Sequence, residues 1–136
     1  FEIAHLEQLM KETEIKPMVN QVEYHPYLTR RELTAYCGKR GIQMEAWSPL
    51  MRGQMDNDLI KGIANKYNKS VAQVILRWDI QSNFVTIPKS FNQSRIIENF
   101  SIFDFELTNE EMEDIYLLDK GEHLPPPDLS KFRSNI

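Results

Sequence analysis

The sequence has a single cysteine, no long apolar run and no block of basic residues. One thiol, Cys37, cannot build a disulfide framework, which is typical of proteins in a reducing compartment. No apolar run approaches the roughly 18 residues of a membrane-spanning helix, and no signal peptide opens the chain. Its 16 Lys and Arg residues against 20 Asp and Glu residues give a net charge of −4, without a clustered basic surface. We therefore expect a cytoplasmic protein that binds neither nucleic acid nor membranes.

The sequence does contain enough apolar residues for a core, because 41% of its 136 residues are hydrophobic. The chain opens directly on the helical pattern FEIAHLEQLMKE, with no helix start signal before it. We therefore expect residues 1–136 to be part of a longer protein. The Pro-rich segment 121–136 is expected to form an irregular tail.

The predicted elements alternate between helix and strand. Helices are predicted at 1–12, 28–41, 59–67, 71–78, 94–100 and 109–119, and strands at 16–26, 42–49 and 84–90. Capping boxes are predicted at three helix starts, namely Thr29 with Glu32, Ser70 with Gln73, and Thr108 with Glu111. Alternation of this kind implies parallel strands joined by crossover helices. Because three parallel strands leave two open edges, we expect a small wound sheet or, in view of the abrupt start, part of a barrel.

Polar residues follow the predicted strands, at the end where βα proteins bind ligands. Gln21 can donate and accept a hydrogen bond at once, which suits an amide ligand but equally a structural hydrogen bond. Trp47 offers a flat face to a flat ring, although a tryptophan near a proline is also typical of simple packing. Both readings of these two residues stay open at this point.

Lys89, Ser90 and Arg95 lie around the start of the helix predicted at 94–100. The first turn of a helix presents backbone N–H groups and the positive end of the helix dipole, and both attract anions. The alternative is that Lys89 and Arg95 are solvated surface cations. Their position favours an anion site, because phosphate sites in (β/α)8 barrels commonly follow the last two strands.

Three segments, NQVEYHPYLT, EAWSPL and IPKSFNQSRIIENF, resemble the aldo-keto reductases, specifically the branch of microbial glyoxal, methylglyoxal and diketogluconate reductases. The resemblance covers nearly the whole chain in order, which makes it far more specific than one motif. It implies an α/β fold, the C-terminal part of a (β/α)8 TIM barrel comprising about strands six to eight with their helices. Phe1 then corresponds to the last residue of a GVSNF-like motif.

The resemblance also implies that this half of the enzyme binds NADPH. The implied contacts are Gln21 with the nicotinamide carboxamide, Trp47 with the nicotinamide ring, Ser48 and Leu50 with the pyrophosphate, Lys89, Ser90 and Arg95 with the 2′-phosphate, and Glu98 and Asn99 with the adenine. On this interpretation Lys89 and Arg95 select NADPH over NADH, since only NADPH carries the 2′-phosphate.

The catalytic residues of the family, a Tyr assisted by a Lys, an Asp and a His, belong to the first four barrel strands and their loops. No residue of this chain is therefore expected to be catalytic, and no metal ligand is expected. Tyr24, His25 and Tyr27 belong to the family's sixth-strand motif, and we interpret them as structural. The whole enzyme is expected to reduce aldehydes or ketones to alcohols with NADPH, and the 136-residue chain alone is expected to be inactive.

Two other functions remain open on the sequence. The chain could belong to a non-catalytic nicotinamide-nucleotide-binding module of the same fold, or to an unrelated barrel that binds a phosphosugar. The partner expected for the reductase itself is a small carbonyl substrate. We expect the whole enzyme to be monomeric, and the isolated chain to self-associate through its open strand edges.

Overall fold

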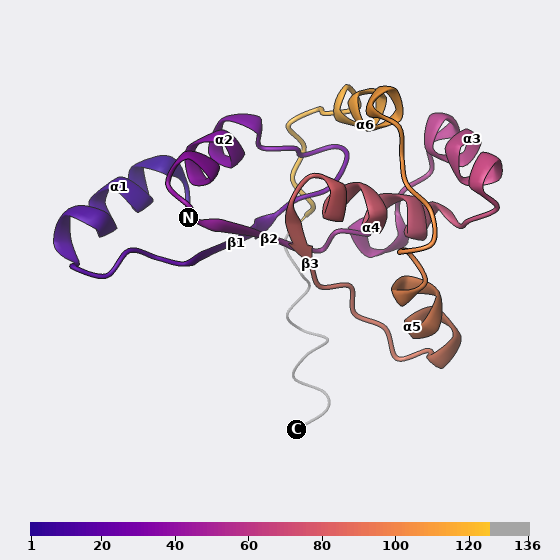
Figure 1. Ribbon diagram of the computed structural model, residues 1–136, viewed down its shortest axis with the longest axis horizontal. Helices are drawn as coiled ribbons and strands as arrows, with labels where there is room; N and C mark the ends of the chain where they lie inside the picture. Colours follow the sequence, from indigo (N-terminus) through magenta and orange to yellow (C-terminus); the bar gives the residue numbers. More distant parts are fainter. Residues whose placement is uncertain (126–136) are drawn as a thin grey trace.

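The computed structural model describes residues 1–125, which form a three-stranded parallel sheet covered by helices (Figure 1). In chain order the elements are α1 (Ile3–Glu12), β1 (Val19–Glu23), α2 (Arg31–Lys39), β2 (Gln43–Trp47), the 3-10 turn η1 (Met51–Gly53), α3 (Asp58–Tyr67), α4 (Val71–Gln81), β3 (Phe84–Thr86), α5 (Gln93–Phe100) and α6 (Asn109–Tyr116). The predicted alternation of helices and strands is confirmed.

The strands lie side by side in chain order, β1-β2-β3, and both pairs are parallel. Val19 lies opposite Gln43, and Met44 lies opposite Phe84. Parallel pairing places the carboxyl ends of all three strands at the same end of the sheet, as the sequence predicted. We call this end the carboxyl edge. The loops that leave this edge carry most of the candidate site.

Among residues 1–125, the helices that contact the sheet cover one of its faces. Helix α2 packs on β2, α4 packs on β3, and α3 packs on α4 farther from the sheet (Figure 1). Val22, Ala46 and Phe84 are buried beneath these helices. Val19 and Val85 point to the other face, where they are 50% and 41% exposed. The alternation of buried and exposed residues follows the strand period of two, except at Glu23, which is also buried at the end of β1.

Two of the three predicted capping boxes are confirmed. The Ser70 hydroxyl accepts a hydrogen bond from the Gln73 backbone N–H (3.2 Å), while the Gln73 side chain accepts one from the Ser70 N–H (3.0 Å). Thr108 and Glu111 make the same exchange at the start of α6. Each box satisfies two backbone groups that the first turn of a helix leaves without an intrahelical partner.

The capping box predicted at Thr29 is wrong. Helix α2 begins at Arg31, and its N-cap is Arg30, whose φ of 48° lies in the left-handed region. The Thr29 hydroxyl instead donates a hydrogen bond to the Asp119 carboxylate, which also accepts from the Thr29 N–H (3.3 Å). The Thr29 side chain is bonded to a partner ninety residues away in the chain instead of capping the helix, and the N-cap lies one residue later than the pattern predicts.

Strand β3 is shorter than predicted, because it ends at Thr86 and the sequence predicted a strand as far as Ser90. Ile87, Pro88 and Lys89 continue as irregular chain toward α5. Pro88 has no backbone N–H to donate to a neighbouring strand, which favours the end of a ladder here. The shortening places Lys89 and Ser90 in a loop rather than at a strand end.

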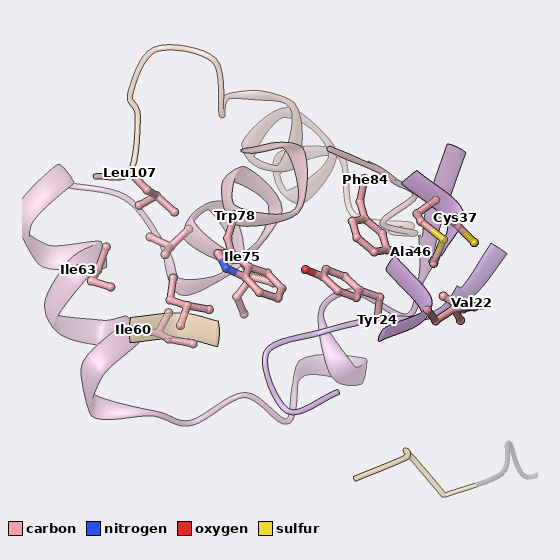
Figure 2. Packing of buried hydrophobic residues seen from close by; sticks show 14 of the residues in the cluster. Val22, Tyr24, Cys37, Ala46, Ile60, Ile63, Ile75, Trp78, Phe84 and Leu107 are labelled. Carbon is pink, nitrogen blue, oxygen red and sulfur yellow. The ribbon is translucent and has the colours of Figure 1, made fainter. Parts of the chain in front are cut away.

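An aromatic stack joins the sheet to α4. Figure 2 shows the Tyr24 ring between the rings of Trp78 and Phe84, with centroid distances of 4.9 Å and 3.7 Å. Tyr24 is fully buried, and its hydroxyl lies 3.2 Å from that of Tyr116. His25 is also fully buried. These positions agree with a structural interpretation of the EYHPY motif.

The chain after α6 folds back on the end of β1. The Glu23 carboxylate accepts a hydrogen bond from the Leu124 N–H (2.8 Å) and contacts the His123 ring (2.8 Å). Residues 121–125 have no regular secondary structure, as predicted, and the rest of the predicted tail lies outside the described residues.

Within residues 1–125, no helix has the length and apolar character needed to cross a membrane.

Candidate functional site

A cavity of about 460 Å³ opens beside the carboxyl edge of the sheet. Its walls come from the loop after β2, from α4 and from the β3–α5 connection, and its lining residues are Leu50, Arg52, Gly53, Met55, Val71, Ala72, Ile75, Lys89, Ser90, Arg95, Glu98 and Asn99. Small-molecule sites typically enclose about 300–1,000 Å³. Six of the nine residues predicted for cofactor binding line this one cavity: Leu50, Lys89, Ser90, Arg95, Glu98 and Asn99.

The floor of the cavity is apolar and rigid. Val71, Ala72 and Ile75 lie on the first turns of α4, directly after its capping box. Ile75 also belongs to the buried core, so the floor cannot shift without disturbing the packing against the sheet. A flat apolar group can rest on this surface while charged groups contact the rim.

One wall is built by the turn that leads into α5. The Asn92 side chain caps the helix by accepting from the Arg95 N–H (3.2 Å), and the Asn92 N–H donates to the Ser90 hydroxyl (3.1 Å). The Ser94 hydroxyl donates to the same Asn92 oxygen (2.6 Å). These bonds fix the first turn of α5, which carries Arg95 on the cavity wall, and the dipole at this end of the helix favours an anion.

The cations of the cavity have no acidic partners. Within the part of the chain that the structure describes, neither Arg52, Lys89 nor Arg95 lies within 4.0 Å of a carboxylate. Elsewhere lysines are paired, for example Lys69 with Asp104 at 2.7 Å. The Lys89 ammonium instead lies 3.4 Å from the centroid of the Phe91 ring. Three cations and one acid, Glu98, line the cavity, so its lining carries an excess of positive charge that suits an anion.

The other three predicted residues lie outside the cavity: Gln21 is in the middle of β1, and Trp47 and Ser48 are at the carboxyl end of β2. The Gln21 side-chain amide donates to the Glu45 carboxylate on the exposed face of the sheet. Trp47 ends β2 and is 36% exposed. Ser48 follows with a left-handed φ of 56°, and its carbonyl accepts from the Met51 N–H (2.9 Å). The structure thus brings six predicted residues together and places these three along the rim of the open sheet face.

The sequence interpretation missed residues on two walls. It assigned no role to Arg52, Gly53 or Met55, although a cation in the loop after a strand is the kind of signal that pointed to Lys89. It also missed Val71 and Ala72, whose helical spacing reads as ordinary core. Only the tertiary arrangement distinguishes a helix face that lines a cavity from one that is fully packed.

Two buried acids near the sheet differ in their ionisation. Burial would raise the pKa of Glu23, but hydrogen bonds from Leu124, His123 and His25 outweigh it and lower that pKa below its ordinary value. Burial raises the pKa of Asp79 well above its ordinary value, and only the Thr86 hydroxyl (2.7 Å) opposes this shift.

Across residues 1–125, His, Cys, Asp and Glu side chains form no cluster of three suited to a metal ion.

Comparisons with known proteins place the chain in a family. The model of the aldo/keto reductase family matches residues 1–120. The chain belongs to this family. It is 62% identical over 127 residues to the glyoxal reductase of Bacillus subtilis, covering 93% of this chain and 46% of that protein. It is 44% identical over 132 residues to the methylglyoxal reductase DkgA of Escherichia coli, covering 94% and 48%.

Solved structures of the family superpose on most of the chain. The apo form of Gox0644 matches with a TM-score of 0.87 and 38% identity, over 90% of this chain and 46% of that one. An aldo-keto reductase of Bombyx mori in complex with NADP matches with a TM-score of 0.85 and 35% identity, over 98% and 47%. The chain spans about half the length of the relatives it matches, and its sheet is part of a (β/α)8 barrel, as predicted.

Proposed function

We propose that this chain forms the NADPH-binding part of an enzyme that reduces aldehydes or ketones to alcohols. The observation that carries the proposal is the cavity, which six residues predicted to bind the cofactor line together. Relatives that share its fold include structures described as complexes with NADPH or NADP. Membership of the aldo/keto reductase family also argues against an unrelated phosphosugar-binding barrel.

The α5 wall is proposed to hold the adenosine end of the cofactor. Lys89 and Arg95 pair with the 2′-phosphate, with the Ser90 hydroxyl and the N–H groups of the first helical turn as further donors. Glu98 and Asn99, one turn farther along α5, contact the adenine edge. The unpaired state of both cations supports this role, since a phosphate would complete their interactions without displacing a carboxylate.

The region around the carboxyl ends of the strands is proposed to hold the nicotinamide end of the cofactor. The exposed Trp47 indole provides a stacking face that fixes the plane of the nicotinamide ring. The Gln21 amide already donates its N–H to Glu45, which leaves its oxygen to accept a hydrogen bond from the nicotinamide carboxamide. Ser48 and Leu50 lie between this edge and the cavity, where the pyrophosphate would pass.

The bound cofactor would supply the hydride that reduces the carbonyl carbon. The residues of this chain would contribute binding and orientation, because they hold the cofactor by its phosphates and its ring. None of them is proposed to donate the proton, and Tyr24 is unsuited because its hydroxyl is buried against Tyr116. We therefore propose that the 136-residue chain alone does not turn over substrate.

A hybrid enzyme tests this proposal. It joins this chain to the part of the Bacillus subtilis glyoxal reductase that the chain does not match, in the order of that protein. We expect the hybrid to oxidise NADPH when methylglyoxal is added, and each isolated part to show no turnover. A folded hybrid that binds NADPH without turnover would favour the second candidate, a non-catalytic nucleotide-binding module. A folded hybrid that binds no nicotinamide nucleotide would contradict both.

A further inference from the structure

The Glu23 carboxylate is buried on a face of the sheet where its neighbours along β1 are exposed. Among residues 1–125 no helix contacts this face, which we call the open face. Val19, Gln21 and Glu23 share it, because side chains two residues apart in a strand point to the same side. Val19 is 50% exposed, whereas Glu23 is 4% exposed. The difference comes from residues 119–125, which we call the C-terminal strap and which contact the Glu23 carboxylate.

The first residues of the strap are tied to the loop between β1 and α2. The Asp119 carboxylate accepts a hydrogen bond from the Thr29 N–H (3.3 Å). The N–H groups of Lys120 and Glu122 both donate to the Tyr27 carbonyl (3.1 Å and 3.2 Å). None of these bonds involves Glu23, so the start of the strap should stay in place when the Glu23 carboxylate is removed.

The Glu23 carboxylate holds the end of the strap. One of its oxygens accepts from the Leu124 N–H (2.8 Å), and the other lies 2.8 Å from His123 Nδ1. His25 Nε2 lies 3.4 Å from the first oxygen, and the Arg30 Nε–H donates to the Glu23 backbone carbonyl (2.8 Å). Hydrogen bonds to an ionised acceptor are stronger than bonds between neutral groups. A single buried side chain therefore fastens residues 123–124 to the end of β1.

This anchor lies beside the residues that are proposed to hold the nicotinamide. Glu23 lies opposite Trp47 in the register of β1 and β2, and both side chains belong to the open face, as does Gln21. Hydride transfer requires the carbonyl carbon to lie about 3–3.5 Å from the donor atom of the cofactor. The substrate would thus have to lie near the ring that stacks on Trp47. The strap borders this space, to which the proposed function has so far assigned no residue.

We propose that Glu23 is a positioning residue that fixes residues 121–125 as one side of the carbonyl-binding site. The inference rests on the proposed function and extends it to the substrate. Glu23 acts through the strap, and it contacts neither the cofactor nor the reacting carbonyl. Loss of the anchor should therefore weaken the binding of the carbonyl substrate and leave the binding of NADPH unchanged.

Glu23→Ala in the hybrid enzyme tests the inference, because it removes both contacts with the end of the strap. We expect it to raise the KM for methylglyoxal about tenfold, while kcat and the NADPH dissociation constant stay within about twofold. Hydrogen exchange without cofactor should become faster in residues 121–125. Glu23→Gln is the matched control, since its amide oxygen still accepts from the Leu124 N–H, and it should keep most of the substrate affinity.

A shortened hybrid that ends at Glu122 separates action through the strap from a role in the core. It lacks both contact residues, so its KM for methylglyoxal should already be raised, and Glu23→Ala should raise it no further. The same increase in the full and the shortened hybrid would overturn the inference. His123→Ala removes one contact of a side chain that is 60% exposed, so it should fold even if Glu23→Ala does not, with a smaller rise in KM.

Two further outcomes distinguish this inference from the proposed function. If the unsubstituted hybrid reduces methylglyoxal and neither Glu23→Ala nor His123→Ala changes KM, only this inference fails. A fall in kcat with unchanged KM would also overturn it, because that result would place Glu23 in the chemical step. If the unsubstituted hybrid folds but does not turn over methylglyoxal, the proposed function fails first.

Discussion

Neutralising Lys89 or Arg95 should convert the hybrid enzyme from an NADPH-selective binder to one that hardly distinguishes NADPH from NADH. Lys89→Met and Arg95→Gln remove each charge and keep much of the side-chain length. Both cations are free of acidic partners in the described residues, so neither substitution leaves a buried carboxylate unpaired. The change should therefore act on the ligand rather than on folding.

The magnitude follows from the exposure of the two cations. Hydrogen bonds to charged groups contribute about 1.5–3 kcal/mol. Lys89 and Arg95 are both exposed, so solvent and salt screen them and the lower end applies. A loss of about 1.5 kcal/mol corresponds to about a tenfold weaker NADPH complex. The two losses should not be additive in the double variant, because both side chains contact one phosphate.

Equilibrium titration with NADPH and NADH measures this effect, and NADH is the internal control. We expect the NADPH dissociation constant to rise about tenfold in each variant and the NADH value to stay within twofold. The selectivity of the unsubstituted hybrid should also decline as ionic strength rises. Equal losses for both cofactors would refute the assignment to the 2′-phosphate. Unchanged binding of both would return Lys89 and Arg95 to the class of solvated surface cations.

Further predictions concern stability and assembly. Because burial raises the pKa of Asp79, the folded protein should retain a proton that unfolding releases. The contribution of Asp79 to the unfolding free energy should therefore fall by about 1.4 kcal/mol per pH unit from the ordinary carboxyl value of 3.8 up to the raised pKa of the folded state. Urea unfolding should show this contribution as a difference in pH dependence between the hybrid and Asp79→Asn; the same pH dependence in both proteins would contradict the assignment. Ser70→Ala should destabilise the hybrid by about 1 kcal/mol through loss of the α4 cap, and a change below a few tenths would show that the cap is dispensable. The isolated chain should elute above its monomer mass in size-exclusion chromatography, because β1 and β3 each have one unpaired edge within residues 1–125. A strictly monomeric isolated chain would show that these edges are protected.

Much of the fold could be predicted from local signals. The capping boxes at Ser70 and Thr108 are complete within four residues, so nothing distant had to be known to place α4 and α6. The parallel order of the strands followed from the alternation of helix and strand. The start of α2 could not be predicted, because Thr29 is bonded to Asp119, and a contact between residues so far apart leaves no periodic signal.

The site was predictable where its residues lie in continuous motifs. Lys89, Ser90, Arg95, Glu98 and Asn99 belong to one segment, and the structure brings all five to the cavity. Arg52 was missed although it lies, like Lys89, in a loop that follows a strand, and only the tertiary structure shows that it lines the same cavity as Lys89. The same holds for Val71 and Ala72, since a helix residue that faces a cavity has the same spacing as one that faces the core.

Hydrogen exchange of the hybrid enzyme with and without NADPH tests the central claim most directly, because it locates the bound cofactor on the chain. The account predicts that NADPH slows exchange of the backbone amides in residues 48–55 and 89–99, and that NADH protects the second segment less than the first. Protection confined to the Bacillus subtilis part, with both segments of this chain unchanged, would contradict the claim that this chain forms the NADPH-binding cavity.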